Sequence, residues 1–482
     1  MSLSGALSNA MSGLVANARG TTVISSNIAN ALNETYGRRE LSLSTNATQT
    51  SGGVVVAQVT RHADPILAYQ KRLALADHAS NSAFADYHTG IEQAIGSVDT
   101  LGSVAEKLTR FETALLSAAS DPSSETRLRS ISVAAEAFAG GLRNASSGID
   151  ALRTRADAEI ARTIERLNAG LSQLETLNGQ IMTAKHLGQD VHGLMDRRDA
   201  TLDALAEFIP LHVVERDSGK IAVFSAQGRT LLDERAVTFG FEPTPVILPH
   251  MTVDNGLLSR LSIDGQPVEI PGPGRMNGGS LAAQFAIRDV IAPQAQQRLD
   301  AVARDAIERL GPGGPDTTLG PTDKGILTDN GIPFDASNET GLAGRISVNT
   351  MLDVASSEPW RWRAGLNAAA PGDVGQSGLL LALHAQINTA SVPGSATLGV
   401  APRSLVNHIQ DLSNRAAADR VRSDEVRTEA LAHLTELRGA TAADGVNTDQ
   451  ELQKLIQLEK SYSANARVVQ VVDDMLSELL RI

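Results

Sequence analysis

The sequence contains no cysteine, which excludes disulfides, cysteine nucleophiles and thiolate metal sites. Aromatic residues make up only 3% of the 482 residues. The core must therefore be built from Ala, Leu, Val and Ile, a composition that favours helix packing. Acidic residues outnumber basic ones by 55 to 42, and the net charge of −13 argues against binding to nucleic acid.

Targeting and membrane segments are also missing. The N-terminus lacks the basic region and uninterrupted apolar run of a secretory signal peptide, because its apolar residues alternate with Ser, Asn and Gly. No stretch approaches the roughly 20 apolar residues that a membrane helix requires. We therefore expect neither a membrane partner nor a cleaved signal peptide.

The sequence offers little catalytic or ligand-binding chemistry. Its ten His residues are scattered, and there is no HExxH motif, P-loop or GxSxG elbow. Asp329-Asn330-Gly331 with Asp335 resembles part of a calcium loop but lacks its spacing and terminal Glu, which favours an ordinary turn. The WRWR run at 360–363 is expected to pack in a loop with solvated arginines. We expect no enzyme, no cofactor and no metal site.

The positive feature of the sequence is an apolar stripe at heptad spacing at each end of the chain. A stripe this narrow needs a partner helix to cover it. The simplest interpretation is that the two ends pair with each other and with further copies, which would make the chain an assembly subunit. The 4,3-spaced positions are Leu3, Leu7, Ala10, Leu14, Asn17, Thr21, Ile24, Ile28 and Ala31 at the N-terminus and Leu455, Leu458, Tyr462, Asn465, Val469, Val472, Leu476 and Leu479 at the C-terminus.

The first helix, expected from about residue 3 to residue 32, carries almost no charge. Arg19 is the one charged residue before Glu34, so no i,i+4 ion pairs support this helix. The face opposite the stripe contains Ser, Asn and Gly, including Gly13 and Gly20, and these are mediocre to poor helix formers. We expect this helix to be stable only when it is packed on several sides, and to be frayed and partly disordered otherwise.

The middle of the chain is mostly helical and contains one stretch of β-structure. Helix is expected from residue 65 to about residue 210, with breaks at 96–102, 121–122, Gly140-Gly141 and 188–193, and the periodicity at 149–187 predicts a long amphipathic helix. Residues 211–216 and 221–225 flank Asp217-Ser218-Gly219 and predict a β-hairpin. Further strand-like runs continue to about residue 270.

The predicted fold class is mainly α with a small β domain. The N- and C-terminal helices are paired as a coiled coil, long helices form a bundle body, and the β-structure is an insert. A length of 482 residues allows about three domains of roughly 100–200 residues each. The predicted domains are a terminal helical domain at 1–60 plus 400–482, a helical-bundle domain at 61–211 plus 276–399, and a small β domain at 212–275.

Both ends of the chain resemble one family, the flagellar axial proteins of bacteria, which comprise rod, hook and hook-associated proteins. At the N-terminus the resemblance rests on MSGL at 11–14 and SNIAN at 26–30. At the C-terminus it rests on GVN at 445–447, SYSANARVVQ at 461–470 and DML at 474–476.

The middle is similar to the hook-associated members that form the first junction between hook and filament. The similar segments are GLMDRRD at 193–199 and GGSL at 278–281. One departure is TYGR at 35–38, where the glycine follows the tyrosine instead of preceding it.

This resemblance implies a structural subunit that joins hook to filament and serves as the adaptor on which the filament assembles. It implies export through the flagellum's own type III apparatus, and therefore an extracellular location without a cleaved signal peptide. The implied partners are further copies in a ring of about eleven subunits, the hook protein, a second junction protein or the filament, and an export chaperone that binds the C-terminal helix.

The residues predicted to form the assembly interface come from both terminal stripes and from the SNIAN signature. Asn17 and Asn465 either set the register of an apolar seam or face the channel or solvent. Two other functions remain open: another axial protein, such as a hook protein or a flagellin-like subunit, or an intracellular coiled-coil adaptor. The predicted interface residues are Leu3, Leu7, Leu14, Ile24, Asn27, Ile28, Asn30, Leu455, Leu458, Tyr462, Asn465, Val469, Val472, Leu476 and Leu479.

Overall fold

The computed structural model describes residues 3–45, 53–98, 100–270 and 277–480. The long helices are α1 (Leu3–Ala29), α2 (Pro65–Ile95), α3 (Val104–Ser120), α4 (Glu125–His186), α5 (His192–Ala206), α7 (Ala292–Arg309), α10 (Gly378–Asn388), α11 (Leu405–Asp444) and α12 (Thr448–Leu479). The shorter helices are α6 (Gly279–Ala286), α8 (Leu342–Arg345) and α9 (Arg361–Ala364), and a π-helical turn (Ile287–Ile291) joins α6 to α7.

Short antiparallel sheets accompany the helices, which confirms the predicted mainly α fold with small β elements. Two sheets have two strands, β1–β2 and β9–β10, and two have three strands, β3–β4–β5 and β6–β7–β8. The strands are β1 (Arg39–Thr45), β2 (Val54–Arg61), β3 (Leu211–Glu215), β4 (Ile221–Ser225), β5 (Thr230–Leu232), β6 (Phe239–Gly240), β7 (Leu261–Ile263), β8 (Gln266–Val268), β9 (Leu327–Asp329) and β10 (Ile346–Val348).

The chain forms two compact units. The terminal unit contains Met1–His78, Ala169–Val237 and Ala430–Ile482, and the central unit contains Ala79–Asn168 and Thr238–Glu429. The strands expected in one domain at 212–275 therefore belong to both units, β3–β5 to the terminal unit and β6–β8 to the central unit. Residues 271–276 lie outside the described residues, and the three-domain division stays a prediction.

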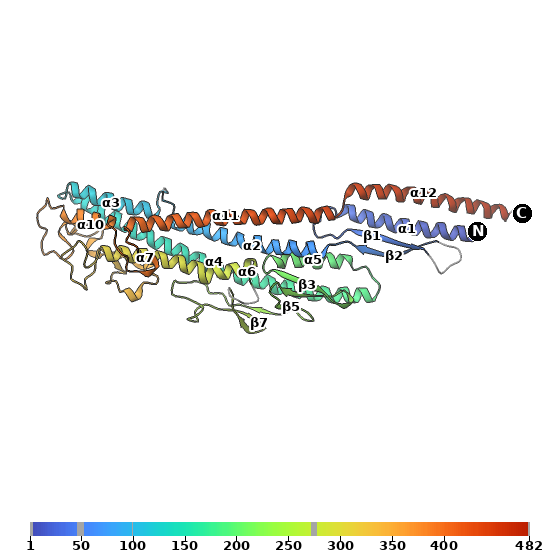
Figure 1. The fold of residues 1–482 in the computed structure, drawn as a ribbon, viewed down its shortest axis with the longest axis horizontal. Coiled ribbons are helices and arrows are strands. Elements are labelled where there is room, and N and C mark those ends of the chain that lie inside the picture. Colours follow the sequence, from blue (N-terminus) through green and yellow to red (C-terminus); the bar gives the residue numbers. More distant parts are fainter. Residues whose placement is uncertain (1–2, 46–52, 99, 271–276, 481–482) are drawn as a thin grey trace. The chain divides into compact units, whose positions relative to one another are not determined.

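In the terminal unit, α1 contacts α12 and also contacts both strands of the β1–β2 hairpin (Figure 1). The predicted hairpin after residue 210 is confirmed, since β3 and β4 pair from Leu211↔Ser225 to Glu215↔Ile221. Its turn contains Ser218 and Gly219 at φ values of 60° and 82°, which only a flexible turn sequence adopts easily.

Helix α4 is longer than the sequence predicts. It spans 62 residues and runs through Gly140-Gly141, where a break was expected. A Cβ atom on Gly141 would lie 2.8 Å from Cδ of Lys107 on α3. The glycine therefore allows α3 to pack closely on α4, and this packing offsets the poor helix propensity of the residue.

The central unit has one extended core of Leu, Ile, Val and Ala from α3, α4, α7, α10 and α11. Two aromatic residues of this core, Phe111 and Trp362, meet edge to face with ring centroids 6.2 Å apart. Trp362 is 1% exposed and donates from Nε1 to Oγ of Ser132 at 2.9 Å. The composition-based prediction of an aliphatic helical core is consistent with this packing.

The WRWR run at 360–363 does pack into this core, but the expectation of solvated arginines is wrong. Arg363 is 5% exposed and donates from Nη1 to the carbonyl of Pro122 at 3.0 Å. Arg361 pairs with Glu358 at 2.8 Å. A guanidinium group can be buried in this way because its N–H groups reach backbone carbonyls and carboxylates.

Two buried arginines hold the strand-containing segment of the central unit against α4. Arg153 donates to the carbonyls of Leu248 and Met251 at 3.2 and 2.9 Å. Arg288 donates to Asp157 at 2.6 Å, and both side chains are fully buried. Each guanidinium thus satisfies several acceptors that would otherwise be buried without a partner.

Two carboxyl groups of the central unit, on Asp150 of α4 and Asp300 of α7, have strongly raised pKa values. Burial raises the pKa of each to about 6, and the charge of Asp300 contributes at Asp150. Asp300 accepts hydrogen bonds from the backbone N–H groups of Gly341 and Ala343 at 2.7 and 2.9 Å. One oxygen of Asp150 is buried without a partner.

We expect Asp150 and Asp300 to stabilise the central unit more at pH 5 than at pH 7, whereas His88 and His408, whose pKa values burial lowers, act in the opposite direction. The folded state binds protons at Asp150 and Asp300 more tightly than the unfolded chain does, where the pKa of Asp is about 3.9, so protonation of these carboxyls favours folding. Asp150→Asn isolates this contribution: it should be more stable than wild type at pH 7, and its advantage should shrink at pH 5. Thermal unfolding of both proteins at the two pH values measures this. An advantage that is the same at both pH values would contradict the assignment.

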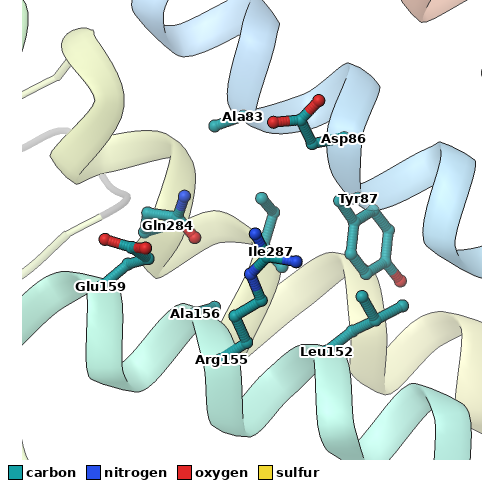
Figure 2. A pocket seen from close by; sticks show the side chains of 9 residues that line it. All are labelled: Ala83, Asp86, Tyr87, Leu152, Arg155, Ala156, Glu159, Gln284 and Ile287. Atoms are coloured by element: carbon teal, nitrogen blue, oxygen red, sulfur yellow. The ribbon is translucent and has the colours of Figure 1, made fainter.

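A hollow of about 110 Å³ lies between α2, α4 and α6 of the central unit (Figure 2). Arg155 extends into it from α4, while Asp86 and Glu159 line its sides. The ring of Tyr87 is buried, and burial raises the pKa of its hydroxyl. Ligand pockets usually measure about 300–1,000 Å³, and this hollow has only about a third of the lower value.

Candidate assembly interface

Helices α1 and α12 pair in antiparallel orientation in a single register (Figure 1). Each step of three, four or seven residues forward along α1 matches an equal step backward along α12. This constancy shows that the two helices stay in contact over several turns without slipping. The pairs that define the register are Gly13 with Asn465, Asn17 with Ser461, Gly20 with Leu458, and Asn27 with Glu451.

Gly13 and Gly20 allow α1 to approach α12 closely. A Cβ atom on Gly13 would lie 2.5 Å from Nδ2 of Asn465, and one on Gly20 would lie 2.7 Å from Cδ1 of Leu458. Both distances are shorter than any normal packing contact. The prediction that these glycines lie on the face opposite the contact is therefore wrong. Their seven-residue spacing, continued at Asn27, is the signal that could have revealed them.

The structure places the predicted interface residues at different depths. Within one chain, the terminal helices cover only part of the two stripes, so the contribution of these residues to contacts between subunits stays a prediction. Ile24, Asn27 and Val472 are buried; Leu3, Leu7, Leu14, Ile28, Asn30, Leu455, Leu458, Asn465 and Val469 are half-buried; and Tyr462, Leu476 and Leu479 are exposed.

Asn17 and Asn465 both lie between the paired helices. Asn17 is 7% exposed and donates from Nδ2 to Oγ of Ser461 at 3.1 Å. The side chain of Asn465 covers the backbone of Gly13. A polar residue at such a position disfavours shifted pairings because a shift would leave its amide without a partner.

Asn27 is the centre of a buried hydrogen-bond cluster where α1 meets the hairpin and the first turn of α12. Its side chain is fully buried, and Glu451 is 2% exposed. Its Nδ2 donates to the carbonyl of Arg39 at 2.8 Å and to Oε2 of Glu451 at 2.9 Å. Its Oδ1 accepts from the hydroxyl of Tyr36 at 2.9 Å and from the backbone N–H of Arg39 at 3.0 Å. One carboxamide thus joins three segments of the chain.

Next to this cluster, three carboxylates on one face of α5 form a charged ladder with basic residues of the hairpin and α2. Burial lowers the pKa of Arg61, but Asp199 and Asp196 outweigh this effect and raise the pKa overall. The 193–199 segment stood out in the sequence only as a family resemblance, and its pattern did not predict this role. The ladder consists of Arg39–Asp196 (3.2 Å), Arg61–Asp196 (2.8 Å), Arg61–Asp199 (2.7 Å), Arg72–Asp199 (3.1 Å), Arg72–Asp203 (2.7 Å) and Lys71–Asp203 (2.6 Å).

The ladder also explains why glycine follows Tyr36. The backbone N–H of Gly37 donates to Oδ1 of Asp196 at 3.1 Å. A Cβ atom on Gly37 would overlap the side chain of Arg61. Glycine at this position therefore lets Arg61 reach Asp196 over the backbone.

Replacing Asp196 with Asn should destabilise the terminal unit by about 3 kcal/mol, since removing one partner from a largely buried ion pair leaves the other charge unpaired. Hydrogen exchange of β1, β2 and α5 would detect the loss. Asp233→Asn is the matched control, because Asp233 and Arg216 lie 3.4 Å apart and are both about half exposed, and their pair should be worth only about 0.5 kcal/mol. Equal effects in the two variants would contradict the ladder's importance.

The paired terminal helices retain an uncovered apolar surface. Several large side chains of α1 and α12 stay exposed although each helix already has a partner. No other part of the terminal unit covers them among the described residues. The exposed apolar residues are Met11 and Val15 on α1 and Leu452, Ile456, Tyr462, Val468, Val471, Met475, Leu476 and Leu479 on α12.

The described residues show neither a metal-binding nor a membrane-spanning feature. Across residues 3–45, 53–98, 100–270 and 277–480, there is no group of three or more His, Cys, Asp or Glu side chains that could hold a metal ion. Asp329 of the calcium-like turn instead pairs with Arg345 at 2.8 Å. In the same ranges, every helix is too short or too polar to cross a membrane.

Known flagellar proteins match both the middle and the C-terminal end of this chain. The family model described as "Flagellar hook-associated protein FlgK helical domain" matches residues 88–310, and the one described as "Flagellar basal body rod FlgEFG protein C-terminal" matches residues 437–482. Flagellar hook-associated protein 1 of Bacillus subtilis (strain 168) is 23% identical over 98% of this chain and 97% of its own length. The chain is similar to flagellar hook-associated protein 1 along nearly its whole length.

More distant relatives align over shorter stretches. Flagellar hook-associated protein 1 of Salmonella typhimurium is 24% identical over 62% of this chain and 55% of its own. A solved structure, the flagellar hook junction protein FlgK from Burkholderia pseudomallei, is 21% identical, with a TM-score of 0.41 over 54% of this chain and 46% of its own. The chain thus spans about half the length of these two relatives. These similarities confirm the resemblance found in the sequence and indicate a structural protein of the flagellum.

Proposed function

We propose that the chain is the subunit of the hook–filament junction and the adaptor on which the filament assembles. The observation that supports this most directly is the exposed apolar surface of the paired helices α1 and α12. Burial of such a surface is favourable by about 25 cal/mol per Å². The terminal helices therefore gain most when further copies cover them, as they would be covered in a tube.

The helical middle of the chain favours the junction over the hook itself. The helical-domain family model covers residues 88–310, and long helices dominate that range, with only the short strands β3–β8 among them. A hook or rod protein would be expected to carry mainly β-structure between its terminal helices. An intracellular coiled-coil adaptor would not need the exposed apolar surface on α12.

The proposal includes partners and a route to the site of assembly. The subunits form a closed ring of about eleven copies that binds the hook protein on one side and a second junction protein or the filament on the other. Before assembly, a small helical chaperone covers the exposed apolar residues of α12, and the type III apparatus exports the chain.

Deletion of the gene tests the function. Cells without the subunit should make hooks that carry no filament, and they should shed filament subunits into the medium. Restoring the gene should restore filaments. Filaments that attach normally in the deletion strain would contradict the junction role, while absence of hooks would indicate a hook protein instead.

A second test addresses the surface that carries the proposal. Val471→Glu with Met475→Glu places charges on the exposed face of α12 without altering the seam with α1. We expect a folded monomer that is released into the medium but is not retained at hook tips. Lys460→Glu, on an exposed polar position of the same helix, should assemble normally. Normal assembly of the double variant would contradict the assigned surface.

A further inference from the structure

The central unit contains a second pocket, distinct from the hollow of Figure 2 and from the assembly interface. It has a volume of about 260 Å³ and lies between α7, the loop at 397–403 and the start of α11. From α7 it receives Arg298 and Val302, which are one turn apart. Along α11 the lining residues recur at i, i+3, i+4 and i+7, so they share one helix face. They are His408, Asp411, Leu412 and Arg415.

Positive charge in this pocket exceeds negative charge. Asp411 pairs with Nε of Arg415 at 2.7 Å and lies 3.9 Å from Nη1 of Arg403. One carboxylate therefore serves two guanidinium groups. Arg298 has neither an ion pair nor a hydrogen bond within the described part of the chain. An uncompensated cation in a concave site is unexpected in a chain with a net charge of −13.

His408 supplies a second, independent indication of a ligand. It is 3% exposed, and its Nε2 is buried without a hydrogen-bond partner. Burial lowers the pKa of His408, so the ring is neutral at pH 7. Asp305 and Arg309, the nearby charged pair, are bonded to each other at 2.8 Å. A buried polar atom without a partner costs about 1–3 kcal/mol, which a ligand atom could offset.

We propose that this pocket is an oxyanion-binding site that accepts a carboxylate or phosphate group. Guanidinium groups bind both kinds of oxyanion through paired, charge-assisted hydrogen bonds. Arg298 provides an unpaired positive charge. Arg403 and Arg415 share one carboxylate and so add further positive charge, and the His408 ring can donate from Nε2. Val302, Leu398 and Leu412 give the rest of the lining an apolar character that suits a short aliphatic attachment. The oxyanion comes either from a free anion or from an acidic side chain of a second copy of this chain.

Calorimetric titration of the full-length monomer with inorganic phosphate at constant ionic strength tests the site. We expect saturable binding, and we expect Arg298→Gln to weaken it at least tenfold. Arg298 lacks a partner, and Gln is a good helix former, so this variant should fold. Arg422→Gln is the matched control, since Arg422 is exposed on α11 outside the pocket, and it should bind phosphate like wild type.

Absence of saturable binding, or equal loss in Arg298→Gln and Arg422→Gln, would overturn the proposal. The binding measurement uses the monomer, so its failure leaves the junction role untouched. Counting subunits at hook tips distinguishes the two sources of the oxyanion, a free anion and an acidic side chain of a second copy. Reduced incorporation of Arg298→Gln indicates an acidic side chain from a neighbouring copy, and unchanged incorporation indicates a free anion.

Discussion

Replacing Asn27 with Ala should destabilise the terminal unit by about 3–5 kcal/mol. The substitution removes four hydrogen bonds. It leaves the backbone of Arg39 and Oε2 of Glu451 without this partner in the interior, and each such group costs about 1–3 kcal/mol. Since a typical domain is stable by about 5–15 kcal/mol in total, this single loss should separate α12 from α1 in a large fraction of molecules.

Hydrogen exchange read out by mass spectrometry measures this effect because it assigns the loss to particular helices. Protection should fall in α1 and in the first turns of α12 while the central unit keeps its protection. Asn30→Ala is the control, since Asn30 donates only to the carbonyl of Ser26 in its own helix, at 2.9 Å. If Asn27→Ala and Asn30→Ala exchange alike, the cluster does not hold the helices together.

Asn27→Asp tests the effect of a negative charge at this position while the size of the side chain stays nearly the same. The two side chains have nearly the same size, but the aspartate places a second carboxylate beside Glu451, where Nδ2 of Asn27 lies 2.9 Å from Oε2. Like charges at that distance repel strongly in a buried site. The Asp variant should therefore be about as unstable as the Ala variant at pH 7 and recover part of its stability at low pH.

Gly20→Leu should open the pairing of α1 with α12 and abolish assembly. Even the Cβ atom would lie 2.7 Å from Cδ1 of Leu458, and overpacking of a well-packed contact costs about 1–3 kcal/mol or more. The helix propensity of Leu exceeds that of Gly by about 0.8 kcal/mol, which offsets only part of this cost. Circular dichroism of the monomer and the occupancy of hook tips are the two measurements.

Two variants make the Gly20 experiment specific. Gly179→Leu is a matched control, because Gly179 lies in α4 of the same unit and a Cβ atom added there would have no neighbour within 4 Å, so it should be tolerated. Combining Gly20→Leu with Leu458→Ala removes the atoms that collide, and this combination should restore pairing in part. A Gly20→Leu variant that assembles like wild type would show that close approach of the helices is dispensable.

The two stripes differed in how well the sequence predicted them, for a physical reason. On α12 several positions of the predicted stripe face α1, as Leu458 and Asn465 show. On α1 the seam is formed largely by small residues, Gly13 and Gly20 among them, because the backbones are close together. A search for apolar side chains reads such positions as a polar face and misses them.

Other differences arise from contacts that act over long separations in sequence. Local pattern predicted the β3–β4 hairpin, because its turn and alternation are encoded within about fifteen residues. It did not predict that strands β6–β8 belong to a different unit, since nothing local specifies the helix on which they pack. The roles of Gly141 and Arg363 were also predicted wrongly. Gly141 packs against Lys107, and Arg363 donates to the carbonyl of Pro122, and both partners lie far away in the sequence.

The partners of the buried Asn27–Glu451 contact lie 424 residues apart in the chain. A ribosome that has completed α1 must therefore add nearly all of the remaining sequence before α12 exists. A prematurely terminated product that stops before residue 448 retains the N-terminal signature but has no Glu451 with which to close the pair. Closing of the α1–α12 pair thus depends on completed translation of the chain.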